Sequence, residues 1–238
     1  MYELQKLSRQ QIQLCESTVS SNTFYMIVGD ALISRKPLSV VRMGDGEKRL
    51  WEDVQTNPDD LVLPDKRHDR EWLNKLGVLG IPRGILKSRL MSAADDCSYF
   101  APSISGIWRE DYYNHNLSFR KKYVDNFFVN AWTEEMKIAL FQQARHVLFI
   151  HGNAETADAM QIRSQDKLGV KVSFLKLTSW EETDDIIKKT TKITAPLVLF
   201  SAGPAGKYIG PAIANGLAPR VVIDLGNAAD HWTLSSLQ

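Results

Sequence analysis

One stretch of the chain carries most of the information about its architecture: Val41-Arg42-Met43-Gly44-Asp45-Gly46-Glu47-Lys48. It completes an apolar run that predicts a short buried strand over 38–43, and a helical pattern follows through Trp51 and Val54. One guanidinium and two carboxylates therefore stand at the carboxyl end of a predicted strand. Because ligands bind at this edge in open α/β sheets, the stretch predicts a binding site.

The two acids of this turn predict a cation site. Asp45 and Glu47 are two residues apart, so in an extended turn their side chains leave on the same side. If the carboxylates approach to about 5 Å at an effective dielectric of ~20, their repulsion costs about 3 kcal/mol. A cation relieves that repulsion, and oxygen ligands of this kind suit Mg²⁺ or Mn²⁺ together with the phosphate oxygens of a substrate.

The other residues of the turn suit a diphosphate. Arg42 offers a planar fork that matches phosphate, and Gly44 and Gly46 leave room for close backbone approach. The following helix offers free N–H groups to the same anion. Alternatively, Asp45 only caps that helix, Glu47 lies in its first turn, and Arg42 neutralises both acids.

Two well-known nucleotide-binding motifs are incomplete in this chain. A dinucleotide fingerprint that starts at Gly44 fails because Arg49 stands where its third glycine belongs. A P-loop that includes Lys207 fails because Ser201 replaces its first glycine and Tyr208 its final Ser or Thr. The sequence therefore does not predict a nicotinamide dehydrogenase or a P-loop enzyme.

Other predicted strand ends also carry candidate residues. Gly203 and Lys207 open a helix and could form a pocket for an anion or a sugar. Alternatively, this segment is only a tight strand-to-helix connection with Pro204 at the helix start. His151 and Asn153 follow another strand, where the histidine could contact a substrate or be a satisfied polar group.

The C-terminal end of the chain offers candidates for a catalytic base. Asp224 ends the last predicted strand, in a position for general-base catalysis or for binding a sugar hydroxyl. His231 and Trp232 could fold over the site as a base and a stacking platform. Alternatively, this tail is a packed end of the domain.

The front half of the chain has a mixed pattern. Amphipathic helices are predicted over 3–18 and 22–35, and a further helix over 69–76. The glycine-rich apolar run 77–82 predicts a short strand that ends at a proline. Segment 83–125 is aromatic and irregular, and we expect several of its rings on one helix, namely those of Trp108, Tyr112, Tyr113, Phe119 and Tyr123.

The back half alternates strands and helices. The four predicted strands are 146–151, 171–175, 197–200 and 220–225. The helices between them are predicted to end near 167, 191 and 215. This alternation is typical of an α/β fold with a doubly wound, mostly parallel, Rossmann-like sheet.

The composition agrees with one globular domain over 1–238. Hydrophobic residues make up 44% and charged residues 24%, and a net charge of +1 argues against a protein built around a polyanionic duplex. Cys15 and Cys97 have no CxxC spacing, which fits a reducing compartment. Because the chain shows neither a signal-like N-terminus nor an apolar stretch of about eighteen residues, we expect a cytoplasmic protein with no membrane span.

Several of these motifs together resemble a known family. The first is Arg42-Met43-Gly44-Asp45-Gly46-Glu47, which resembles the Arg-x-Gly-Asp-Gly-Glu signature of the GT-D-type glycosyltransferases, once catalogued as a bacterial domain of unknown function. The others are Ala202-Gly203-Pro204-Ala205-Gly206-Lys207 and Val222-Ile223-Asp224-Leu225-Gly226, which are similar to the closing elements of that family. The resemblance covers roughly 20–230.

The resemblance implies a GT-D-like, Rossmann-like fold that begins with two helices, a nucleoside-diphosphate sugar donor and a divalent metal. Carried over to this chain, Asp45 and Glu47 engage the metal and the nucleotide, and Arg42 faces the diphosphate. The chain departs from the family pattern at Asn227, since the family commonly has His after Asp-x-Gly.

This departure affects the catalytic base. Asn227 cannot shuttle a proton, so we expect His231 or Asp224 to take that role, unless catalysis does not need it. It also motivates an alternative from another class, a non-catalytic protein that binds nucleotide sugars.

We therefore predict a metal-dependent glycosyltransferase that uses Mn²⁺ or Mg²⁺ to move a sugar, with UDP-sugar as the expected donor, to an acceptor hydroxyl. The predicted donor site spans four segments, 42–47, 151–155, 203–207 and 224–227. The acceptor would arrive from the aromatic 99–132 side, where rings can stack on sugars or bases. It could be a glycan, a glycoprotein or, given eleven Lys and Arg against six Asp and Glu over 66–122, a modified base in DNA.

Overall fold

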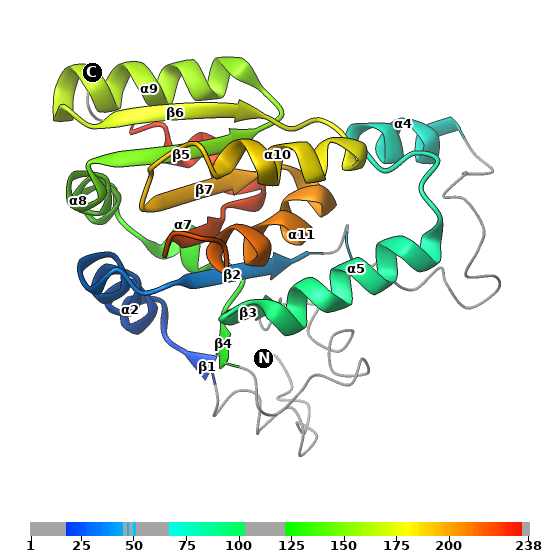
Figure 1. The fold of residues 1–238 in the computed structure, drawn as a ribbon, viewed down its shortest axis with the longest axis horizontal. Coiled ribbons are helices and arrows are strands. Elements are labelled where there is room, and N and C mark those ends of the chain that lie inside the picture. Colours follow the sequence, from blue (N-terminus) through cyan, green and yellow to red (C-terminus); the bar gives the residue numbers. More distant parts are fainter. Residues whose placement is uncertain (1–17, 45–46, 48–49, 51–66, 103–121, 235–238) are drawn as a thin grey trace, which may run out of the picture.

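The structure is a computed structural model that describes residues 18–44, 47, 50, 67–102 and 122–234. These residues form one sheet of eight strands. The strands are β1 (Thr18–Val19), β2 (Leu38–Met43), β3 (Tyr99–Pro102), β4 (Lys122–Val124), β5 (His146–His151), β6 (Lys171–Lys176), β7 (Leu197–Ser201) and β8 (Val221–Asp224). They lie in the order β1-β4-β3-β2-β8-β7-β5-β6, and all neighbouring pairs are parallel (Figure 1).

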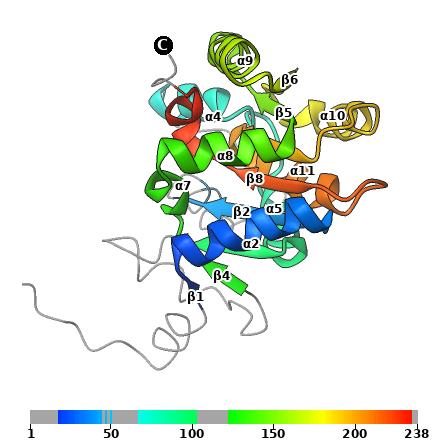
Figure 2. The same ribbon diagram turned by 90° about the vertical axis from the view of Figure 1, so that its left-hand side faces the viewer.

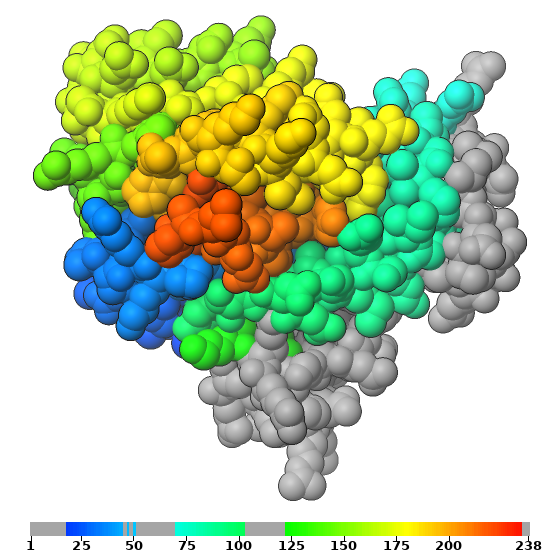
Figure 3. Space-filling model, in the orientation of Figure 1, coloured from blue at the N-terminus to red at the C-terminus, as the bar shows by residue number. Residues whose placement is uncertain are grey.

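Helices cover both faces of this sheet. One face is covered by α2 (Ser21–Ser34), α7 (Phe128–Ala131), α8 (Glu134–Ala144), α9 (Ala154–Leu168) and the 3₁₀ helix η3 (Gly226–Trp232). The other face is covered by α4 (Arg67–Lys75), α5 (Arg83–Asp96), the 3₁₀ helix η2 (Trp180–Glu182), α10 (Thr183–Thr190) and α11 (Gly203–Ala214). Figure 2 shows α9 and α10 on opposite sides of β5 and β6, and Figure 3 shows α5, α10 and α11 packed into one continuous surface.

The chain winds along the sheet in two directions, one on each face. Connections toward β6 pass through α7, α8 and α9, whereas connections toward β1 pass through α5, α10 and α11. The neighbouring strands β2 and β8 lie where the two directions meet, because the chain leads from β2 to α5 and from β8 to η3 on the opposite face. Such a switch point is where ligands bind in doubly wound sheets.

The helices begin and end at residues suited to those positions. The side chain of Ser20 accepts the Thr23 amide at 3.1 Å and caps α2, and the side chain of Asn153 accepts the Glu155 amide at 2.9 Å and caps α9. Helix α9 ends at Gly169, whose φ of +63° is the left-handed conformation that glycine adopts easily.

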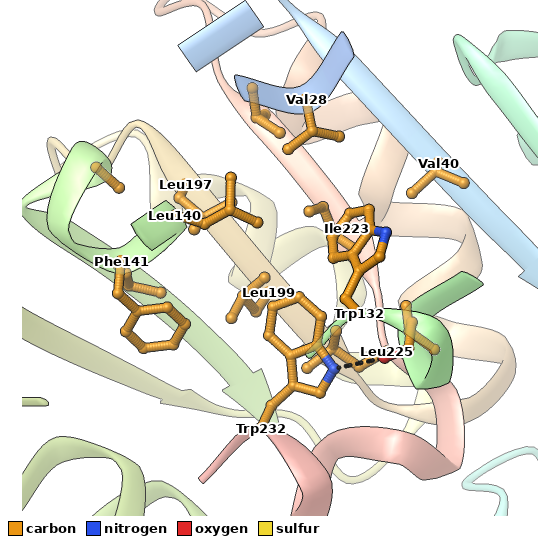
Figure 4. Close-up of a cluster of buried hydrophobic side chains, with 14 of the residues drawn as sticks. Val28, Val40, Trp132, Leu140, Phe141, Leu197, Leu199, Ile223, Leu225 and Trp232 are labelled. Atoms are coloured by element: carbon orange, nitrogen blue, oxygen red, sulfur yellow. Dashed lines mark hydrogen bonds between the residues drawn. The ribbon is translucent and has the colours of Figure 1, made fainter. Parts of the chain in front are cut away.

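Two tryptophans join the last helix to the core on the α8 face (Figure 4). The ring centroids of Trp132 and Trp232 lie 5.8 Å apart, and Trp232 Nε1 donates to the Val129 carbonyl at 3.3 Å. Trp232 has no exposed surface. The prediction that it serves as a stacking platform is therefore wrong, and the alternative of a packed C-terminal end is correct for this residue.

Most of the predicted elements are confirmed. The helices over 22–35 and 69–76 correspond to α2 and α4, and the 38–43 strand to β2. The four strands and three intervening helices of the back half are all present, and the parallel α/β fold is confirmed. The helix predicted over 3–18 lies outside the described residues apart from Thr18, which belongs to β1. Also outside them are Trp108, Tyr112, Tyr113 and Phe119.

Two predictions in the front half are wrong. Residues 77–82 form turns instead of a strand, with φ of +68° at Gly77 and +84° at Gly80. Segment 83–125 is not irregular throughout, since it contains α5, β3 and β4, and Tyr123 lies in β4 instead of a helix. No helix within the described ranges is both long and apolar enough to cross a membrane.

Helix α11 packs on the sheet through glycines, which generates a stability prediction. A Cβ on Gly206 would lie 2.6 Å from a ring carbon of Phe200, so Gly206→Ala should overpack the core at a cost of about 1–3 kcal/mol. This cost should exceed the helix-propensity gain of up to about 1 kcal/mol. The control is Gly29→Ala in α2, where a Cβ would meet only Gln143 at 3.8 Å, so that variant should be more stable than wild type. Urea denaturation measures both, and a Gly206→Ala protein as stable as wild type would contradict the packing.

Candidate functional site

Polar residues follow the strands at one edge of the sheet. The strand order makes the carboxyl ends of β2, β8, β7 and β5 consecutive neighbours. Phe200 in β7 pairs with Asp224 in β8, and His151 in β5 pairs with Ser201 in β7. The four strand ends predicted to form one site therefore adjoin each other.

Asp224 lies at the centre of this edge. Its side chain is completely buried. Oδ2 accepts the backbone N–H of Arg42 at 2.9 Å, just beyond Val40–Ile223, the last β2–β8 pair in register, so the carboxylate continues the ladder between these strands. Oδ1 accepts the backbone N–H of Gly226 at 2.9 Å and shapes the turn after β8.

Lys207 neutralises this buried carboxylate. Its Nζ lies 2.7 Å from Asp224 Oδ2 and 3.6 Å from Glu47 Oε1, and the residue is 4% exposed. Burial lowers the pKa of Lys207, but the attraction of Asp224 and Glu47 outweighs it, so the pKa is raised from its usual 10.5. The ammonium therefore stays charged at neutral pH, and a positive charge is fixed beside two carboxylates.

The sequence of α11 explains why Lys207 reaches this position. The helix begins at Gly203 with φ of +53° and Pro204 in its first turn. Gly206 and Gly210 lie against the ring of Phe200, where any side chain would be crowded. Because these glycines let the helix approach the sheet closely, Lys207 on its second turn contacts the end of β8.

Arg42 joins the ends of several strands. Its Nε donates to the backbone oxygen and to Oδ1 of Asn126, at 2.7 and 2.8 Å, and its Nη1 donates to the carbonyl of Leu225. The residue is 8% exposed. Burial lowers the pKa of Arg42, three nearby carboxylates oppose this shift, and the guanidinium remains charged at neutral pH. Arg42 thus lies between the loop after β4 and the turn after β8.

The turn after β8 requires glycine at position 226. Gly226 has φ of +50°, and a Cβ there would lie 2.7 Å from Nη1 of Arg42. Its carbonyl accepts the hydroxyl of Ser201 at 2.5 Å, which connects the turn to the end of β7. Backbone conformation and the space taken by Arg42 therefore both select glycine.

Glu47 is the described residue of the acidic turn that lies at the site. Its Oε2 accepts the backbone N–H of Gly44 at 2.9 Å, and its backbone is helical, as predicted. Asp45 and Gly46 lie outside the described residues, so the convergence of the two acids, and the alternative of a simple helix cap, stay predictions. The described ranges contain no cluster of three or more His, Cys, Asp or Glu side chains that could hold a metal.

The predicted histidine of β5 lies one strand farther along the edge. His151 stacks on Phe149, and its Nδ1 lies 2.9 Å from the backbone nitrogen and 3.1 Å from the backbone oxygen of Asn153. Asn153 itself caps α9. Their roles in binding a ligand stay predictions.

Asn227 and His231 lie on η3 with exposed side chains. The carbonyl of His231 accepts the ammonium of Lys137 at 3.0 Å, which ties η3 to α8. Asp224, its partners Arg42, Lys207 and Gly226, and Glu47 form what we call the group around Asp224. Within the described part of the chain, neither the side chain of Asn227 nor that of His231 is hydrogen-bonded to this group. Their catalytic roles stay predictions too.

Sequence reasoning missed Asn126, which is 7% exposed and bonds Arg42 through two oxygens. A signal was present: Lys122-Tyr123-Val124 is a strand, and the polar pair Asp125-Asn126 follows it directly. The three-residue strand was too short to recognise within an aromatic segment.

The pairing of Lys207 with Asp224 generates a stability prediction. Lys207→Met should leave a buried carboxylate without its countercharge and cost about 3–5 kcal/mol. The control is Lys189→Met, which removes an exposed pair with Asp185 at 2.6 Å and should cost at most about 0.5 kcal/mol. Because the pKa of Lys207 is raised on folding, its contribution should persist below pH 10.5 and disappear only as the pH rises through the higher folded value. Chemical denaturation measures each effect, and equal losses in the two variants would contradict the pairing.

Comparison with solved structures identifies the same fold in three chains. A selenomethionine structure of domain of unknown function 1792 has 16% identity and a TM-score of 0.54, over 97% of this chain and 86% of that one. A structure of this domain described as having a distinct glycosyltransferase fold has 15% identity and a TM-score of 0.54, over 96% and 86%. A glycosyltransferase of this domain class from Streptococcus sanguinis has 13% identity and a TM-score of 0.51, over 92% and 85%.

The sequence comparison gives the family. A search of curated proteins finds no significant match. Residues 19–232, however, match the profile of GT-D fold-like domains, a range that contains the whole group around Asp224. The chain therefore belongs to the GT-D-like family and has a glycosyltransferase fold.

Proposed function

We propose that this protein is a metal-dependent glycosyltransferase that moves a sugar from a nucleoside-diphosphate sugar, expected to be a UDP-sugar, to an acceptor hydroxyl. Family membership and the fold shared with a glycosyltransferase support the reaction class. The observation that carries the proposal is the arrangement of charges around Asp224, at the switch point between β2 and β8.

The two cations that the described residues place at this site are already matched inside the protein. Lys207 is paired with Asp224 and faces Glu47, and Arg42 donates to oxygens of Asn126 and Leu225. A donor diphosphate brings further negative charge, and neither cation can approach it fully without giving up these partners. These pairings support a donor that binds together with a divalent ion, which offsets the charge of the diphosphate.

Glu47 is the described residue that fits such an ion. Its Oε2 is used by the Gly44 amide, whereas Oε1 lies 3.6 Å from Lys207 Nζ, a loose contact that leaves lone pairs for a metal. Mg²⁺ and Mn²⁺ take one or two protein carboxylates and complete their shells with phosphate oxygens and water. Glu47 and Asp45 would therefore suffice, and the bound ion would offset the charge that develops on the departing diphosphate.

The remaining groups set the geometry of donor binding. Gly44 has no side chain, which permits a diphosphate to approach this turn closely. The N-terminus of α11, which starts at Gly203, lies at the same edge, and the positive end of the helix dipole there favours an anion. Lys207 keeps a positive potential there, although its ammonium is held by Asp224.

The catalytic base requires a group with a free proton acceptor. Both oxygens of Asp224 accept internal hydrogen bonds, so we assign it a positioning role in preference to that of base. His231 is exposed on η3, which begins at the turn after β8, and histidine is the side chain that most often serves as a general base. We therefore assign His231 as the base and Asn227 as a hydrogen-bonding contact to the substrate.

The metal role is tested through Glu47. Glu47→Gln keeps the size of the side chain but removes the charge that holds the ion, so we expect sugar transfer from UDP-sugar to be abolished. EDTA should abolish transfer by the wild type, and added Mn²⁺ or Mg²⁺ should restore it. Transfer is measured as release of UDP in the presence of an acceptor panel.

The control for this experiment is Asp166→Asn, an exposed carboxylate near the end of α9 that precedes the start of β6 and so lies toward the opposite edge of the sheet. It should transfer sugar at the wild-type rate. Undiminished transfer by Glu47→Gln in EDTA would rule out the metal role.

The assignment of the base is tested through His231. His231→Gln should lower kcat by roughly 10²–10⁴-fold with little change in the KM for the donor, since general-base catalysis contributes about this much. The control is His146→Gln at the start of β5, whose ring bonds Ser173. Rates are measured by the same UDP-release assay, and an unchanged kcat would move the base to another group.

A non-catalytic nucleotide-sugar-binding protein is the second candidate, and Asn227 favours it because the family commonly has His there. Calorimetry distinguishes the two. Donor binding without hydrolysis or transfer across the acceptor panel would favour the binding protein, whereas turnover would exclude it.

A further inference from the structure

Asn126 lies directly after β4 and is held at three points. Its backbone N–H donates to the carbonyl of Pro102, the last residue of β3, at 3.2 Å. Its backbone oxygen and its Oδ1 both accept from Nε of Arg42. The carboxylate of Asp125 accepts the next amide, that of Phe127, at 2.7 Å and so shapes the turn. The loop after β4 is therefore fixed relative to both β3 and β2.

Arg42 extends this connection across the sheet. In the strand order β4-β3-β2-β8, it lies on β2, reaches past β3 to Asn126, and contacts Leu225 after β8 on the other side. Its own backbone N–H is held by Asp224. Two residues later, at Gly44, the chain enters the acidic turn that supplies Glu47.

We propose that Asn126 is a positioning residue: through the guanidinium of Arg42 it fixes the end of β2, and thereby the start of the donor-binding turn. Arg42 then acts as an internal staple between strand ends instead of as a direct ligand of the diphosphate. This proposal rests on the proposed function for its effect on catalysis, but the staple itself is a property of the folded chain.

Two features of the site support a staple over a phosphate ligand. Each planar fork of the guanidinium pairs Nη2 with either Nε or Nη1, and both Nε and Nη1 already donate to protein oxygens. The guanidinium also packs against Gly226, where even a Cβ would be too close, so the turn after β8 closes over it. Because Arg42 is held by Asn126 on one side and by Leu225 on the other, a shift of either loop would move the end of β2.

The test compares Asn126→Ala, Asn126→Asp and Arg42→Lys, with Asn130→Ala as the control because Asn130 is an exposed asparagine of the same segment. Asn126→Ala should lower kcat by at least ten-fold, because small displacements of a substrate-positioning group cost up to about 10²-fold. Its KM for the donor should change little. Asn126→Asp keeps both acceptor oxygens and should retain most of the rate, and Asn130→Ala should match the wild type.

A double-variant cycle shows whether the two residues act as one unit. If they do, Asn126→Ala combined with Arg42→Lys should be no more than about three-fold slower than Arg42→Lys alone, because residues that share one interaction are not additive. Independent, multiplying effects would overturn the proposal. So would an Asn126→Ala protein with wild-type kcat, or one whose loss equals that of Asn126→Asp. Rates are compared at a temperature where thermal melts show every variant folded.

A readout that needs no activity separates this proposal from the proposed function. In ¹⁵N NMR, the Nε–H of Arg42 should exchange slowly with solvent without any ligand and should not shift on addition of UDP and Mg²⁺. The protection should be reduced in Asn126→Ala, which keeps only the backbone acceptor, and kept in Asn126→Asp. Rapid exchange in the wild type, or a large shift with UDP, would make Arg42 a ligand and defeat the staple. If the wild type transfers no sugar while these NMR results hold, the proposed function fails and the staple stands.

Discussion

The carboxylate of Asp224 is the group on which the carboxyl edge of this sheet depends. A charge with no exposed surface is costly unless it is paired and hydrogen-bonded. Its donors come from three places: the backbone of Arg42 in β2, the turn at Gly226, and the ammonium of Lys207 on α11. If any of these elements moved, the charge would lose a partner, so the group fixes β2, β8 and α11 relative to one another.

The charged side chains at this edge differ in how far they are already paired inside the protein. Lys207 and Arg42 both have partners inside the protein. Lys207 forms an ion pair with Asp224, and Arg42 donates hydrogen bonds to Asn126 and Leu225. Glu47 is less fully paired than these two cations. Its Oε2 accepts the Gly44 amide, and its Oε1 lies 3.6 Å from Lys207 Nζ. This division supports the proposed cation-dependent donor site, because the positive charges of Arg42 and Lys207, which the sequence analysis assigned to the donor, already have partners.

The sequence predicted individual residues of this group better than their partners. Arg42 and Asp224 were recognisable because each is a polar residue at the end of an apolar strand, and Lys207 because glycines precede it at a helix start. Their contacts follow from strand order, which local patterns do not contain. The turn at Gly77 was taken for a strand because its neighbours are apolar, yet its φ of +68° excludes one. Asn126 was missed because β4 has three residues.

The turn after β8 contains residues that hold the fold next to a residue that is free to contact a ligand. Gly226 is required by its backbone conformation and by Nη1 of Arg42, and Asp224 by the donors around it. Asn227 comes next, and its side chain is exposed and takes no part in this packing. The staple therefore holds the turn whichever residue stands at 227. An asparagine at 227 therefore changes what the protein offers to a ligand without disturbing the buried contacts of Asp224, Gly226 and Arg42.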